Sequence, residues 1–133
     1  MQRVYNIGDL YYEKQMKILI IDNSVEMIER LEEIISEATA NPIVYRALSY
    51  EAALKSFKKN RPEVVLLDIS LSGNRALAIL KEIKEIESGT KIIVLSINPD
   101  DKIKEQCKLL SADFFLDKYY EFEKIPAIIS AIL

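Results

Sequence analysis

Short apolar runs alternate with amphipathic segments along the chain from residue 16 onwards. Three runs of four residues, at 18–21, 64–67 and 92–95, are apolar without interruption. Such runs are typical of strands that are buried on both faces of a parallel sheet. Weaker runs at 43–46 and 114–116 predict the two edge strands of the same sheet.

Between these runs, apolar residues recur at the spacing of a helix. The first predicted helix follows Ser24, which is predicted to be its N-cap. Its apolar stripe consists of Val25, Ile28, Leu31, Ile35 and Ala38. Four further helices are predicted at residues 50–59, 75–87, 101–110 and 121–133. Strict alternation of five strands and five helices predicts a doubly wound α/β fold, with a parallel sheet between two layers of helices and right-handed crossovers.

The first fifteen residues differ from the rest. They lack a clear periodicity and hold three of the seven tyrosines, Tyr5, Tyr11 and Tyr12. We interpret residues 1–15 as an N-terminal extension of unassigned role and residues 16–133 as the α/β domain. The sequence also leaves open that Met16 is the natural start.

The composition of the chain excludes several classes of function. The net charge of −3 and the pI near 5.1 argue against a nucleic-acid-binding surface. The absence of histidine excludes Ser-His and Cys-His catalysis, histidine-ligated metals and phosphohistidine carriers. The lone Cys107 suits a reducing cytoplasm, and the apolar stretch at 125–133 is too short to cross a bilayer. We therefore expect a cytoplasmic protein without nucleic-acid or membrane partners.

Polar residues follow the predicted strands, where the carboxyl ends of parallel strands meet at one edge of the sheet. Asp22 and Asn23 follow the first strand and Asp68 the third, and Ser96 and Lys118 follow the fourth and fifth. Taken singly, each is more often a turn, capping or solvated residue. Together, the carboxylates and the amide predict an oxygen pocket for Mg²⁺, Asp68 a nucleophile for phosphorus, and Lys118 a cation that neutralises a phosphoryl group.

Four blocks make a family resemblance plain. KILIIDNS at 17–24, VVLLDISLSG at 64–73, IIVLS at 92–96 and ADFFLDK at 112–118 resemble the signature blocks of CheY-like response-regulator receiver domains, across residues 16–133. The resemblance implies a flavodoxin-like (CheY-like) three-layer fold. It also implies that Asp68 is the phosphoacceptor and that Mg²⁺ is the cofactor. The other implied roles are the metal-binding acidic pair Asp22 and Asn23, the metal-ligating carbonyl of Ser70, the switch hydroxyl of Ser96, the rotameric aromatic Phe115 and the conserved-type lysine Lys118.

One departure from the family pattern bears on the metal. Asn23 stands where the family usually has a second acid, so Mg²⁺ binding is expected to be weak. Ile97, directly after the switch hydroxyl, is bulkier than the residue that many members have there, and we expect it to narrow access to Asp68.

Two functional hypotheses follow from the resemblance. The first is a two-component receiver, phosphorylated on Asp68 by a histidine kinase or phosphotransfer protein and acting on a downstream protein partner or output domain. The alternative is an atypical receiver that docks proteins independently of phosphorylation. Neither is an enzyme beyond catalysing its own phosphorylation and dephosphorylation, and a homodimer, a stand-alone protein and a domain of a longer regulator all stay open. An aspartyl phosphohydrolase is disfavoured because Ser70 stands where its acid would be, and a flavin carrier because the first loop lacks a phosphate-binding sequence.

Overall fold

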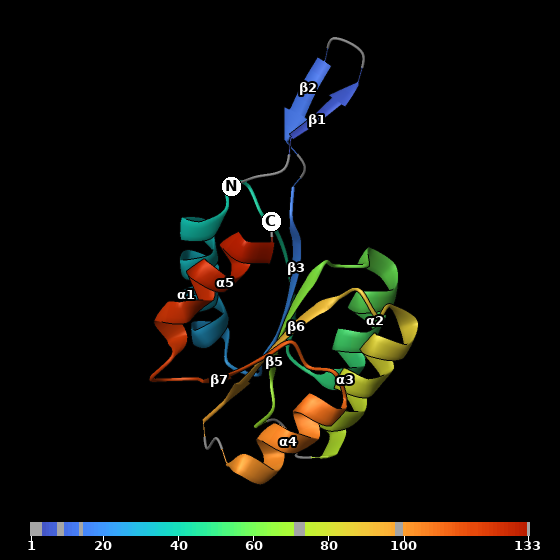
Figure 1. Cartoon of the computed structure of the whole chain (residues 1–133), viewed down its shortest axis with the longest axis vertical. Coiled ribbons are helices and arrows are strands. Elements are labelled where there is room, and N and C mark those ends of the chain that lie inside the picture. The colour runs from blue at the N-terminus through green and yellow to red at the C-terminus, as the bar shows by residue number, and fades with distance from the viewer. Residues whose placement is uncertain (1–3, 8–9, 14, 71–73, 98–99, 133) are drawn as a thin grey trace.

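A parallel five-stranded sheet forms the centre of the computed structural model, which describes residues 4–7, 10–13, 15–70, 74–97 and 100–132. The strand order is β4-β3-β5-β6-β7, and all neighbours are parallel (Figure 1). Its strands are β3 (Lys17–Ile21), β4 (Ile43–Ala47), β5 (Val64–Asp68), β6 (Lys91–Ser96) and β7 (Phe114–Asp117). The chain adds β4 on one side of β3 and then crosses to place β5 on the other side. The strand order therefore switches between β3 and β5, and a crevice for ligands is expected at the carboxyl ends of these two strands. The predicted doubly wound, flavodoxin-like fold is confirmed.

Helices cover both faces of the sheet (Figure 1). On one face lie α1 (Val25–Ala38) and α5 (Ile125–Ile132), and on the other lie α2 (Tyr50–Asn60), α3 (Asn74–Ile86) and α4 (Asp101–Leu109). Alternate residues of each strand point to opposite faces. In β5, for example, Val65 packs into the core beneath α2 and α3, while Leu66 packs into the core beneath α1 and α5. Two buried faces explain why the central strands are apolar without interruption.

The helices begin where the sequence supplies caps. The Ser24 hydroxyl accepts a hydrogen bond from the amide of Met27, as predicted, and Ser49 and Asp100 cap α2 and α4 in the same way. The last helix was predicted to begin at residue 121. It is instead a 3₁₀ turn (η1, Phe122–Lys124) followed by α5, because Pro126 lacks an amide hydrogen and is accommodated only in the first turn of a helix. Leu133, the predicted end, lies outside the described residues.

An antiparallel hairpin precedes the sheet. It pairs β1 (Val4–Ile7) with β2 (Leu10–Glu13) and projects beyond the amino end of β3 (Figure 1). No regular structure was predicted for this segment. The missed signal is the Gly8-Asp9 dipeptide between two β-prone runs, a pattern typical of hairpin turns. Nowhere in the described part of the chain is a helix both long and apolar enough to cross a membrane.

Candidate functional site

Two carboxylates and one ammonium group meet at the carboxyl edge of the sheet. Asp22 directly follows β3, Asp68 ends β5 and Lys118 directly follows β7. The Lys118 Nζ atom lies 2.7 Å from Asp22 Oδ2 and 3.0 Å from Asp68 Oδ2. All three residues are buried, with only 1 %, 3 % and 6 % of their surfaces exposed. Both acids therefore share a single counter-charge in a place that water barely reaches.

This arrangement keeps Lys118 charged. Burial alone would lower the pKa of the Lys118 ammonium, but its contacts with Asp22 and Asp68 outweigh burial and raise the pKa above the ordinary value of 10.5. The group is therefore cationic at neutral pH. It is aimed at the oxygen atoms of both carboxylates.

The backbone fixes the other oxygen of each acid. Asp22 Oδ1 accepts a hydrogen bond from the Ser24 amide at 2.8 Å. Asp68 Oδ1 accepts two, from the Ser70 amide at 2.9 Å and from the Ser70 hydroxyl at 2.5 Å. Asp22 Oδ2 faces the Lys118 ammonium at 2.7 Å. Both carboxylates are thus oriented by the loops that leave their strands.

Tyr50, the first residue of α2, is a further neighbour of Asp68. Its buried hydroxyl donates to the Asp68 carbonyl oxygen at 3.4 Å, and the Arg75 guanidinium lies 5.6 Å from the centre of its ring. Burial raises the pKa of Tyr50 above its usual 10, with a further rise from the charge of Asp68 that Arg75 partly offsets. Nothing in the sequence signalled this contact, because Tyr50 has the pattern of an ordinary core residue.

Ser96 lies on β6, the strand next to that of Asp68, and Phe115 lies on β7, one strand further along the sheet. Ser96 ends β6 and is buried, and its carbonyl accepts the Lys118 amide at 2.9 Å. Phe115 is half-buried on β7, against the core beneath α2–α4. A cavity of about 350 Å³ opens next to Ser96. Its lining residues are Ile69, Ser70, Asn74, Leu77, Ser96, Ile97 and Ile103.

The oxygen atoms at this edge suit a magnesium ion. Within the described ranges, no three acidic, histidine or cysteine residues gather into a metal site, because Asn23 replaces the third acid. The donors that remain are the carboxylates of Asp22 and Asp68, the Ser70 carbonyl and the exposed Asn23 amide. Oxygen donors of this kind are those that Mg²⁺ prefers, and among the described residues the buried Asp22 Oδ2 has no hydrogen-bond partner besides the Lys118 ammonium. The residues therefore fit Mg²⁺, with one negative charge fewer than two acids at 22 and 23 would supply.

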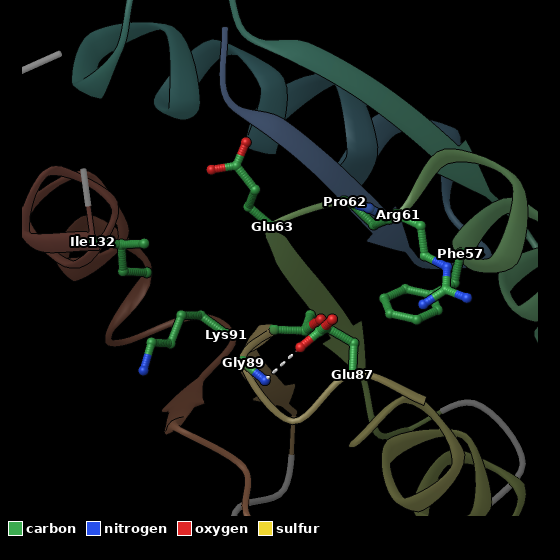
Figure 2. Close-up of a pocket in the computed structure, with 9 residues that line it drawn as sticks. Phe57, Arg61, Pro62, Glu63, Glu87, Gly89, Lys91 and Ile132 are labelled. Carbon is green, nitrogen blue, oxygen red and sulfur yellow. Dashed lines mark hydrogen bonds between the residues drawn. The ribbon is translucent and has the colours of Figure 1, made fainter. Parts of the chain in front are cut away.

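A second pocket, of about 410 Å³, lies at the opposite end of the sheet. Figure 2 shows that the charged side chains of this pocket do not converge on one point. Arg61 lies against the ring of Phe57, and Lys91 extends away from Arg61 and Glu87. Glu87 accepts a hydrogen bond from the Gly89 amide at 3.2 Å. Most of its lining residues lie in the two loops that lead into the amino ends of β5 and β6, away from the acidic edge. The chemistry-bearing side chains of this protein thus gather at the carboxyl edge.

Comparison with known proteins agrees with the observed fold. Chemotaxis protein CheY of Halobacterium salinarum is 29% identical over 118 residues, which cover 88% of this chain and 96% of that protein. The solved receiver domain of a DNA-binding response regulator from Colwellia psychrerythraea 34H superposes with a TM-score of 0.81, at 20% identity, covering 89% of this chain and 98% of that one. CheY in the CheX-CheY-BeF3-Mg+2 complex from Borrelia burgdorferi superposes at 0.77 and 23% identity, covering 89% and 90%.

The family comparison extends over nearly the whole domain. Residues 18–130 match the family model of the response regulator receiver domain. The segment outside the match includes the hairpin, so the division at residue 16 into extension and domain stays a prediction. With the sheet order and the family match in agreement, the chain belongs to the response-regulator receiver family of two-component signalling proteins.

Proposed function

We propose that this receiver accepts a phosphoryl group on Asp68 from a histidine kinase or phosphotransfer protein in the cytoplasm. The observation that carries the proposal is the buried pairing of Asp68 and Asp22 with Lys118, next to the cavity at Ser96. A purely structural ion pair would need only one acid. Here Asp22 and Asp68 share one ammonium, so the cluster keeps a net negative charge and a carboxylate that can attack an electrophile. The Borrelia burgdorferi CheY, solved with BeF3 and Mg+2, supports the same chemistry here.

In the proposed reaction, an Asp68 carboxylate oxygen attacks the phosphorus of the donor phosphohistidine. The phosphorus–nitrogen bond breaks, the electron pair returns to the donor imidazole, and Asp68 becomes an acyl phosphate. Lys118, already 3.0 Å from Asp68 Oδ2, neutralises charge on the transferring oxygens. Mg²⁺, held by Asp22, Asp68, the Asn23 amide and the Ser70 carbonyl, would supply further positive charge to the phosphoryl oxygens.

The output of the switch is a change in partner binding. We expect the Ser96 hydroxyl to turn toward the new anion and Phe115 to turn inward from its half-buried position. The face formed by α4, β7 and α5 would then bind a downstream protein or output domain differently. Such coupling is typically worth about 1–3 kcal/mol, enough to change affinity severalfold.

Beryllofluoride, a phosphoryl analogue, tests the proposal in solution. With Mg²⁺ present, it is expected to shift the amide resonances around Asp68, Ser96 and Lys118 in ¹H–¹⁵N spectra. In Asp68→Asn the same addition should leave the spectrum unchanged, because the neutral amide offers no anionic oxygen for the adduct. An unresponsive parent protein would rule the proposal out.

Asn23 motivates a second candidate function, a docking module that works without phosphorylation. Mg²⁺ titration separates the two, since binding in the millimolar range favours the phosphorylated receiver and no binding favours the docking module. If Asn23 is a metal ligand, Asn23→Asp should tighten Mg²⁺ binding by about tenfold, because it adds a negative charge in contact with the ion.

A matched control separates local from global charge. Asn41→Asp makes the same change at an exposed residue near the amino end of β4 and should leave Mg²⁺ affinity unchanged. Equal affinities of Asn23→Asp and the parent would show that Asn23 is not part of the metal site.

A further inference from the structure

The Ser70 hydroxyl makes a contact with the acceptor that the proposed reaction does not use. We propose that this hydroxyl competes for Asp68 Oδ1 and holds the carboxylate in a resting state, so that it must release Oδ1 when Mg²⁺ or a phosphoryl group arrives. The inference rests on the proposed function, because it concerns the same carboxylate. It assigns to Ser70 a side-chain role distinct from the metal-binding role of its carbonyl.

The hydrogen bonds around Asp68 are unevenly distributed. Oδ1 accepts both the Ser70 amide at 2.9 Å and the Ser70 hydroxyl at 2.5 Å, whereas Oδ2 accepts Lys118 at 3.0 Å. A carboxylate oxygen has two in-plane lone pairs, so a single residue fills both acceptor positions of Oδ1. A cation or phosphorus atom that approaches this oxygen must displace one of the two donors.

Of these two donors, the hydroxyl is the one that can leave easily. The amide is fixed by the turn that leaves β5, and its departure would require the backbone to move. The hydroxyl leaves by rotation about a single side-chain bond between staggered rotamers. Ser70 is also exposed and lines the cavity beside Ser96, while Asp68 is only 3 % exposed. The hydroxyl therefore stands on the side of Asp68 from which a reactant enters.

The bond also makes the acceptor less reactive. A hydroxyl that donates to a carboxylate forms a charge-assisted hydrogen bond, which stabilises the negative charge. This stabilisation is lost when Oδ1 binds a metal or forms an acyl phosphate. Ser70→Ala removes this cost while retaining the backbone amide, so it should favour both events.

Mg²⁺ affinity, measured by calorimetry on the full chain, tests the inference without requiring phosphorylation. Ser70→Ala is expected to lower the Mg²⁺ dissociation constant by about threefold to tenfold, the range for one net hydrogen bond. Ser70→Thr restores a hydroxyl and should return the affinity toward the parent value. Ser36→Ala is the matched control, because the exposed Ser36 hydroxyl also makes a 2.5 Å bond, to the Glu33 carbonyl on α1, away from the acidic edge.

The Mg²⁺ measurement tests the role of the Ser70 hydroxyl independently of whether Asp68 is phosphorylated. An unchanged or weaker Mg²⁺ affinity in Ser70→Ala, or no Mg²⁺ binding by either protein, overturns the inference, even if the parent responds to beryllofluoride. Conversely, tighter Mg²⁺ binding in Ser70→Ala together with a parent that ignores beryllofluoride supports the competition at Oδ1 and rejects phosphorylation.

Discussion

Replacing Lys118 with methionine is expected to lower the free energy of unfolding by about 3–5 kcal/mol, the usual cost of removing one partner from a buried ionic cluster. Methionine fills a similar volume but leaves Asp22 and Asp68, which are almost fully buried, without their ammonium. The two carboxylates then repel each other in a poorly solvated site. The variant should also fail to bind beryllofluoride, because the cation that would face the phosphoryl oxygens is missing.

Urea unfolding of Lys118→Met and of the parent protein at neutral pH measures the effect. Adding Asp22→Asn should recover much of the loss.

The matched control for this substitution is Lys81→Met. It removes an exposed lysine 3.9 Å from Glu85 and should cost less than about 1 kcal/mol, as surface pairs do. A similar small cost for Lys118→Met would contradict the shared-ammonium account of the site.

The sheet could be predicted from the sequence because burial on two faces leaves a strong signal. The run at 64–67 became β5 (Val64–Asp68) and the run at 92–95 became β6 (Lys91–Ser96), each longer by a residue or two. The extra residues at the carboxyl ends, Asp68 and Ser96, are polar and belong to the candidate site. The hairpin at β1 and β2 was missed because each strand has only four residues, too few to give a clear periodicity.

The meeting of Asp22, Asp68 and Lys118 was also predictable, since parallel strands must end at one edge. The individual contacts were not. No pattern in the sequence indicates that Ser70 donates twice to Asp68 Oδ1 or that the Tyr50 hydroxyl reaches the Asp68 carbonyl. Such contacts depend on loop conformation and side-chain rotamers, which hydrophobic periodicity does not determine.

The second large effect is expected at Asp68 itself. Asp68→Asn keeps the shape of the side chain but replaces the anionic oxygen with an amide, which is too poor a nucleophile to form an acyl phosphate. Phosphorylation by acetyl phosphate in the presence of Mg²⁺ should therefore fall from one group per chain in the parent to none. Asp101→Asn, an exposed substitution at the start of α4, serves as the control and should be phosphorylated like the parent.

Locating the phosphoryl group on the chain shows directly whether Asp68 is the acceptor. After incubation with acetyl phosphate and Mg²⁺, borohydride reduction converts a phosphorylated aspartate into homoserine, which peptide mass spectrometry can assign to one residue. We expect homoserine at Asp68 alone, and none in Asp68→Asn. Homoserine at another acid such as Asp22, or none in the parent protein, would contradict this expectation.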